Sequence, residues 1–324
     1  MIKKIYSSEL SVYINGLIDE KRALGYKYNT EAYVLARFDR YWVEQGYTSP
    51  EITIDRLEKW LSPSKKESVS SVSQRVYTVK QLALYMNARN ISAYIPLNKE
   101  KRHKPVIHIL DSGEIKELFS VIDQYRPARP TAETLRMVAE YKVIFRLILT
   151  TGLRRTEATS IRLEDVDVES GKIGILGAKG AKDRTVYLAD DMKKMLAEYI
   201  QSMESIMDDS LEWLFPGIDK KNHISSGGLG IKFHDFWKKT GCKSSNEKNP
   251  TIHSLRHTYV VMRMNVWMEQ GIDFRIMMPY LSKSLGHKSP NETYYYYHQV
   301  ADAFQVIQKK DTMASAVIPE VRVR

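Results

Sequence analysis

The stretch "TTGLRRTEATSIRLEDVDV", residues 150–168, is the point at which the sequence changes from a helical pattern to a strand pattern. Before it, residues 133–153 carry apolar side chains at helical spacing, which predicts a long helix ending near Gly152. From it onward run three short alternating segments, "DVDVES", "KIGIL" and "RTVYL", separated by Gly171 and by "GAKGAK". They predict a small three-stranded antiparallel sheet. The fold class expected is therefore mainly α with one small antiparallel sheet (α+β).

The first hundred residues predict a separate helical bundle. Apolar side chains recur at helical spacing in four segments: residues 8–25, 31–47, 53–61 and 71–89. The basic segment "NKEKRHKPV", residues 98–106, is typical of a linker, and Asp111 with Glu114 three residues later predicts the start of a new helix. We therefore expect two domains, residues 1–102 and 103–324.

The composition favours a polyanionic partner and excludes several classes of protein. The net charge is +10 and the pI is about 9.3, an excess typical of nucleic-acid binding. A single cysteine, Cys242, excludes an internal disulfide and a cysteine-rich zinc site. The N-terminus lacks the pattern of a signal peptide, and the most apolar stretch, "VIFRLILT", is too short to span a bilayer. We expect a cytoplasmic protein that needs no cofactor or metal, since no metal-ligand spacing or Walker-type loop occurs.

Four short motifs contain residues that could carry chemistry. Arg154 and Glu157 are three apart, so the carboxylate could hold the arginine, although an ordinary surface ion pair has the same spacing. Arg155 should point elsewhere. The glycine-spaced turn "GAKGAK" carries Lys179 and Lys182, which could reach a cleft or remain solvated.

The other two motifs contain histidines. His253 lies three residues before Arg256, whose positive charge should lower the pKa of the imidazole and leave it able to take a proton near neutral pH. A structural histidine is the alternative, and we interpret the adjacent His257 as structural. The last motif, "SLGHKSPNETYYYYH", places His287 after a turn at Gly286 and before four consecutive tyrosines. Four successive residues cannot share one helical face, so the tyrosines cannot all play one role.

In their order along the chain, these motifs resemble the tyrosine recombinase (phage integrase) family. The family's boxes are "TGLR" with a carboxylate three residues on, a lysine turn, "H-x-x-R", "LGH" and a nucleophilic tyrosine nine residues after that histidine. The set covers the whole second domain. Nine residues beyond His287 is Tyr296, with Tyr295 and Tyr297 as the alternative registers, and His298 fits a histidine common two residues after the family's tyrosine.

The resemblance implies a phosphoryl transfer without metal or ATP. Tyr296 would attack a DNA phosphodiester and form a 3′-phosphotyrosine, and the energy conserved in that bond would allow a second 5′-hydroxyl to rejoin the strands. Arg154 and Arg256 would meet the negative charge of the transition state, with a hydrogen bond from His287. Glu157 would orient Arg154.

Proton transfers complete the implied mechanism. Lys179 would protonate the leaving 5′-oxygen, with Lys182 as the substitute if the hairpin register is shifted. A free tyrosine is almost wholly protonated at neutral pH, and His253 would accept its proton.

The resemblance also implies partners. The first domain would be a core-binding bundle that clamps double-stranded DNA, and the chain would be of the compact two-domain type. Two duplexes cut on both strands need four active sites, so a homo-tetramer on DNA is expected. The segment with Ala303, Phe304 and Ile307 would pack on a neighbouring subunit, on its own domain, or be a frayed tail.

Two other functions remain compatible with these motifs. A type IB topoisomerase would nick and reseal DNA with the same chemistry, but the helical clamp and the "LGH" box favour a recombinase. A silent DNA-binding accessory protein would be expected to lack a catalytic residue type, and every type is present. The favoured function is a site-specific recombinase that serves a mobile element by integration, excision or transposition.

Overall fold

A computed structural model divides the chain into two compact units, residues 1–105 and 106–324. The division lies close to the boundary expected at residue 102. The structure describes residues 6–64, 67–97, 107–177, 183–204, 211–243, 249–287 and 289–296. Within this part of the chain, no helix is long and apolar enough to cross a membrane.

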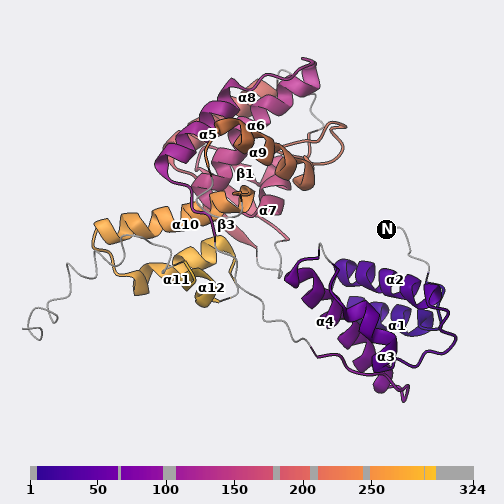
Figure 1. The fold of residues 1–324 in the computed structure, drawn as a ribbon. Coiled ribbons are helices and arrows are strands. Elements are labelled where there is room, and N and C mark those ends of the chain that lie inside the picture. Colours follow the sequence, from indigo (N-terminus) through magenta and orange to yellow (C-terminus); the bar gives the residue numbers. More distant parts are fainter. Residues whose placement is uncertain are drawn as a thin grey trace, which may run out of the picture. The chain divides into compact units, whose positions relative to one another are not determined.

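In its described residues, the first unit is a bundle of four helices (Figure 1), as the sequence predicts: α1 (Ser11–Ala23), α2 (Asn29–Glu44), α3 (Ile54–Leu61) and α4 (Val69–Asn87). The side chains of Thr53 and Ser68 cap the first turns of α3 and α4. Helix α4 packs on the other three. Aromatic side chains, among them Phe38, Trp42 and Trp60, fill the core between the helices.

The second unit is also mainly helical and carries one small sheet, which confirms the predicted fold class. Its helices are α5 (Ser112–Gln124), α6 (Ala132–Thr151), α7 (Arg155–Thr159), α8 (Asp190–Glu204), α9 (Ser226–Thr240), α10 (Ile252–Glu269), α11 (Phe274–Leu285) and α12 (Pro290–Tyr294), with a 3-10 turn at Leu163–Asp165. The antiparallel strands are β1 (Val166–Asp167), β2 (Lys172–Ile175) and β3 (Arg184–Tyr187), in the order β1-β2-β3.

Helix α6 is the centre of the second unit and packs on α5, α8 and α10 (Figure 1). Residues 140–149 in its middle are all buried or half-buried, and the buried side chains of Arg136 and Glu140 pair with each other. A second, smaller core lies between α10 and α11, where Met264, Met278 and Leu285 pack together with Tyr296. The tyrosine is therefore held by the apolar core as well as by polar contacts.

The turn after α6 requires a glycine. Gly152 ends the helix with a φ of +69°, a conformation that side chains with a Cβ resist. A Cβ at this position would lie 2.5 Å from the Tyr259 ring and 2.8 Å from Leu285. The close approach brings the end of α6 against α10 and the end of α11, and the polar site described below lies around this junction.

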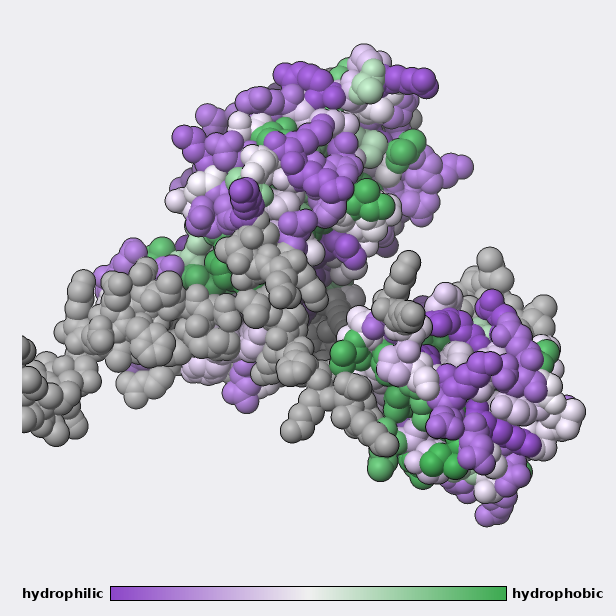
Figure 2. All heavy atoms as spheres, in the orientation of Figure 1, coloured by the Kyte–Doolittle hydropathy of each residue, from purple (hydrophilic) through white to green (hydrophobic). Residues whose placement is uncertain are grey.

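The outer surface is mostly hydrophilic. On the face drawn in Figure 2, hydrophobic residues of the second unit appear as separate spots, whereas those of the first unit gather along one side. Single exposed hydrophobic residues are normal for a folded protein. Charged and polar side chains therefore dominate what a partner would meet on this face.

Candidate active site

Arg154 is positioned by the start of α7. It is the N-cap residue, and Glu157 at the third helical position closes a capping box. The Glu157 carboxylate accepts a hydrogen bond from the Arg154 backbone N–H at 2.9 Å and another from the Arg154 Nη1 atom at 2.8 Å. The contact expected from the spacing of the two residues is present. Arg155 points away, and its guanidinium lies over Gly230 of α9.

Arg184, at the start of β3, is a second arginine on the same carboxylate. Its Nη1 and Nη2 atoms donate to the two Glu157 oxygens at 3.1 and 2.7 Å, and its side chain is only 4% exposed. Burial alone would raise the pKa of Glu157, but the hydrogen bonds from Arg184 and Arg154 outweigh it and lower this pKa to about 2. Arg184 is not among the residues predicted from the sequence, because nothing in its local pattern sets it apart from other charged residues that flank a turn.

Arg256 enters the site from α10 and is almost completely buried. Its Nη1 atom donates to the Gly152 carbonyl at 2.7 Å, and its Nη2 atom donates to the Leu285 carbonyl at 2.9 Å and to His287 Nε2 at 2.9 Å. Burial, together with the nearby positive charge of Arg154, lowers the pKa of Arg256 to about 10, so it remains a cation at neutral pH.

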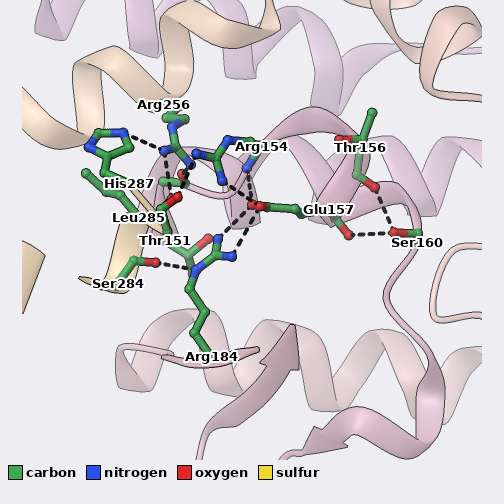
Figure 3. A network of polar contacts seen from close by, with 12 residues as sticks. Thr151, Arg154, Thr156, Glu157, Ser160, Arg184, Arg256, Ser284, Leu285 and His287 are labelled. Atoms are coloured by element: carbon green, nitrogen blue, oxygen red, sulfur yellow. Dashed lines mark hydrogen bonds and ion pairs between the residues drawn. The ribbon is translucent and has the colours of Figure 1, made fainter. Parts of the chain in front are cut away.

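Three arginines from three elements bind three successive carbonyls at the end of α11 (Figure 3). Arg184 Nε donates to the Ser284 carbonyl at 2.6 Å, Arg256 to that of Leu285, and Arg154 Nη2 to that of Gly286 at 2.9 Å. The last carbonyls of a helix have no partner within the helix and carry partial negative charge. The end of α11 therefore fixes the positions of all three guanidiniums.

His287 follows this turn and is fixed at both ring nitrogens. Arg256 donates to Nε2, so Nδ1 carries the hydrogen of the neutral ring and donates to Thr293 Oγ1 at 2.7 Å. Burial and the positive charges of Arg256 and Arg154 lower the pKa of His287 to about 3. The ring is therefore neutral at physiological pH, and its orientation is tied to Thr293 of α12.

Among the tyrosines that the structure describes, Tyr296 is set apart from its neighbours by its burial. It is 5% exposed, whereas Tyr294 is 41% exposed. The hydroxyl of Tyr296 lies 2.6 Å from His257 Nδ1. Burial raises the pKa of Tyr296 to about 12, although the positive charges of Arg256 and Arg154 act in the opposite direction. Tyr296, the tyrosine that the spacing from His287 predicts, is thus a buried tyrosine whose pKa is affected by the positive charges of both arginines.

The histidine beside this tyrosine differs from the one expected. The motif predicts that His253 takes the tyrosine proton and that His257 is structural, but the hydrogen-bond partner of the Tyr296 hydroxyl is His257. Residues 253 and 257 are one helical turn apart in α10, so their rings lie side by side, with centroids 4.5 Å apart. His253 is exposed to solvent over part of its surface. The protein atoms that surround its ring, together with the positive charge of Arg256, nevertheless lower the pKa of the imidazole to about 4.

Several predicted residues lie outside the described part of the chain. They are Lys179, Lys182, Tyr297, His298, Ala303, Phe304 and Ile307. Within the described residues, no three His, Cys, Asp or Glu side chains form a group that could hold a metal ion. The site that is described can bind an anion, because Arg154 and Arg256 present positive charge beside neutral imidazoles and a buried hydroxyl.

The sequence of this chain is similar to those of known integrases and tyrosine recombinases. A sequence model of the phage integrase family matches residues 109–302. The chain is 26% identical over 283 residues to a protein of Sinorhizobium fredii provisionally named integrase/recombinase y4rE, with 86% of this chain and 88% of that protein covered. It is 25% identical over 264 residues to tyrosine recombinase XerA of Saccharolobus solfataricus, with 78% and 76% covered.

Solved structures share the fold. One is the Tn1549 transposon integrase in complex with a circular intermediate DNA, at a TM-score of 0.66 and 15% identity, covering 94% of this chain and 100% of that chain. Another is a lambda integrase tetramer bound to a Holliday junction, at a TM-score of 0.61 and 16% identity, covering 89% and 80%. At these identities the likeness concerns the fold alone.

Proposed function

Because this chain belongs to the phage integrase family of tyrosine recombinases, we propose that it cleaves and rejoins DNA at specific sites through a covalent 3′-phosphotyrosine on Tyr296. The bond between phosphorus and the 5′-oxygen breaks as the bond between phosphorus and the phenolic oxygen forms. The 5′-oxygen leaves as a hydroxyl. Rejoining is the reverse attack by a 5′-hydroxyl, so the energy of the phosphodiester is conserved and neither metal nor ATP takes part.

The observation that carries this proposal is that two guanidiniums are held at the end of α11, beside the core in which Tyr296 is buried together with Leu285. Arg154 and Arg256 both act on the pKa of Tyr296, and both are held in place by carbonyls at the end of α11. Negative charge collects on the non-bridging oxygens during phosphoryl transfer, and fixed cations in a water-poor site stabilise that charge strongly. We propose that the two arginines bind the phosphodiester that the phenolic oxygen attacks.

Each remaining residue has a role that follows from its contacts. Glu157 holds Arg154 by two hydrogen bonds, one of them to the backbone. His287 has its Nδ1 hydrogen bound to Thr293 and its Nε2 atom bound to Arg256, so in the free protein it helps to orient that guanidinium. A phosphate oxygen would compete for the same Arg256 donor. Lys179 remains the proposed acid for the leaving 5′-oxygen.

We also propose the larger assembly. Residues 1–102 would act as the DNA-clamping domain and residues 103–324 as the catalytic domain. Exchange between two duplexes needs four tyrosines, and a lambda integrase, similar to this chain in fold, is a tetramer on a Holliday junction. The proposed partner is therefore a homo-tetramer on paired DNA sites. The biological role proposed is movement of a mobile element.

The test is covalent capture on DNA. The full chain is incubated with duplexes that cover the sequence flanking its own gene and carry nicks near trial crossover points, and adducts are resolved on a denaturing gel. Wild type should give an adduct, and Tyr296→Phe should give none. Tyr295→Phe is the matched control, since its ring contacts that of Tyr296 and the same single hydroxyl is removed.

The outcomes separate the hypotheses. An adduct that persists in Tyr296→Phe and disappears in Tyr295→Phe would move the nucleophile by one residue. Clear DNA binding without any adduct, on every duplex and with all three proteins, would contradict the cleavage mechanism and support a silent accessory protein.

A further inference from the structure

The Tyr296 hydroxyl and the His257 ring form a contact that the proposed function does not use. The phenolic oxygen lies 2.6 Å from His257 Nδ1, and the ring centroids are 5.2 Å apart. Tyr296 is buried against α10 and α11 in a core that includes Met264 and Leu285. The hydroxyl is therefore directed at one imidazole nitrogen by the packing of the phenol ring.

The direction of this hydrogen bond follows from the ionisation of its two partners. Burial lowers the pKa of His257 to about 3, and electrostatic repulsion from His253 and Arg256 acts in the same direction. The ring is therefore neutral. Burial raises the pKa of Tyr296 to about 12, so the phenol is protonated. The short distance then requires the phenol to donate and Nδ1 to accept. The proton that must leave before or during nucleophilic attack already faces His257.

We propose that His257 is a further catalytic residue, the base that accepts the Tyr296 hydroxyl proton as the phenolic oxygen attacks the phosphodiester. This inference rests on the proposed function. The proton passes from the phenolic oxygen to Nδ1, the phenolic oxygen bonds to phosphorus, and the 5′-oxygen leaves with a proton from the general acid. His257 becomes an imidazolium and returns the proton to the phenol when the strand is rejoined.

The surroundings of His257 would make this base active only when DNA is bound. The titratable and charged groups that act on it are His253 and Arg256 on α10, His287 after α11, and Tyr296 after α12. In the free protein they disfavour a proton on Nδ1. A phosphodiester brings one negative charge next to Arg256 and offsets the positive charge that suppresses protonation. Substrate binding should therefore raise the proton affinity of His257.

His253 is then not the base, although its position in the motif suggests this role. Its ring faces His257, whereas the contact to the reacting oxygen belongs to His257. His253 is exposed, which suits a residue that meets DNA directly. The two histidines contact different groups, so substituting one should affect adduct formation in a different way from substituting the other.

The experiment measures single-turnover adduct formation on the nicked duplex with the full chain. His257→Gln keeps an acceptor for the phenol but cannot take a proton at neutral pH. We expect it to form adduct roughly a hundredfold more slowly than wild type at neutral pH, the usual contribution of a general base. Its rate should rise with pH, as the phenolate forms without help. Replacing Tyr296 by a more acidic fluorotyrosine should restore the rate of His257→Gln by at least about tenfold.

His253→Gln is the matched control, since it is the same substitution one helical turn away. We expect it to be slowed as well, but without a gain from fluorotyrosine. Full activity of His257→Gln would overturn the proposal, because the contact would then only orient the phenol. Rescue of His253→Gln but not of His257→Gln would make His253 the base. Tyr296→Phe, run beside them, reports on the nucleophile itself, so a failure of the proposed function is seen separately.

Discussion

At residue 157, one carboxylate accepts hydrogen bonds from two arginines that belong to different elements. Arg154 comes from the start of α7 and Arg184 from β3. The Glu157 side chain is 6% exposed, so its charge is tolerated in the interior only while both guanidiniums remain close. Arg184 also binds the Ser284 carbonyl and thus links β3, α7 and the end of α11.

The lowered pKa of Glu157 predicts how the stability of the second unit depends on pH. The folded pKa, about 2, lies below the ordinary value of 4.5, so the carboxylate stabilises the fold above pH 4.5 and this contribution is lost as the pH falls towards 2. A shift of this size corresponds to about 3 kcal/mol. We expect Glu157→Gln to be less stable than wild type by about this amount at pH 7 and equally stable near pH 2.

Urea unfolding of the full chain, followed by hydrogen exchange in peptides from α10, would measure this difference in the second unit alone. Glu164→Gln is the control. Its carboxylate pairs with Arg162, but both side chains are exposed, so its removal should change stability by less than about 1 kcal/mol at every pH. Equal pH profiles for wild type and Glu157→Gln would contradict the prediction.

Among the secondary-structure elements, the ends of helices make up the site. The C-cap of α6 supplies the Gly152 carbonyl, the N-cap of α7 supplies Arg154, and the end of α11 supplies three carbonyls. Helix ends leave backbone groups without partners, and here arginine side chains satisfy them. The elements must therefore meet within a narrow tolerance, since a guanidinium reaches several of them at once.

The glycine at the end of α6 tests this arrangement. Gly152 and Gly241 both end helices with a left-handed conformation, at φ values of 69° and 71°. A Cβ would contact Tyr259 and Leu285 at Gly152 but nothing within 4 Å at Gly241. We expect Gly241→Ala to cost about 1 kcal/mol from backbone strain alone. Gly152→Ala should cost roughly 2 kcal/mol more from overpacking.

Adduct formation gives a second measurement on the same pair. Gly152→Ala would displace the carbonyl that holds Arg256, so its adduct yield should fall sharply while that of Gly241→Ala stays near wild type. Stability would be followed by urea unfolding and hydrogen exchange in peptides of α6. Equal losses of stability and of adduct in the two variants would argue against the close packing of α6, α10 and α11.

Across the whole molecule, positive charge is distributed unevenly along the chain. Residues 1–105 hold 18 of the 49 Lys and Arg residues and 11 of the 39 Asp and Glu residues, so they carry +7 of the net charge of +10. This unit is the one for which a DNA-clamping role is proposed. When Lys and Arg side chains bind phosphates, counterions are released, and the resulting affinity falls steeply with salt.

The charge distribution predicts which substitutions change the salt dependence of DNA binding. Arg37 and Arg40 are exposed on α2, and Arg37→Gln/Arg40→Gln should lower the slope of log K against log salt concentration by up to about 1.8, or about 0.9 for each phosphate that is no longer bound. Lys238→Gln/Lys239→Gln on α9 removes the same charge from the second unit and should change the slope less. Fluorescence anisotropy across a salt series with the full chain would compare them. A larger effect from the α9 pair would contradict the clamp assignment.

Local sequence patterns are sufficient to predict the elements and the order of the motifs. The helical period of residues 133–153, the alternation after residue 166 and the turn at Gly152 are such patterns, because the backbone propensities that encode them act within a few residues. The nine-residue spacing from His287 to Tyr296 comes instead from the resemblance to the family, and it falls on a tyrosine that is buried while Tyr294 is exposed. Helices and strands could therefore be predicted before any tertiary contact was known, and Tyr296 as the nucleophile stays a prediction.

Which side chains meet depends instead on tertiary packing. Arg184 reaches Glu157 across 27 positions and Ser284 across 100, and His257 reaches Tyr296 across 39. Such contacts follow from how α10, α11 and β3 pack, and no periodicity in the sequence encodes that. His253 and His257 look alike in a local pattern, being one turn apart on the same helix. The packing of the phenol ring against α10 and α11 directs its hydroxyl to His257, because the apolar core holds the rest of the side chain in place.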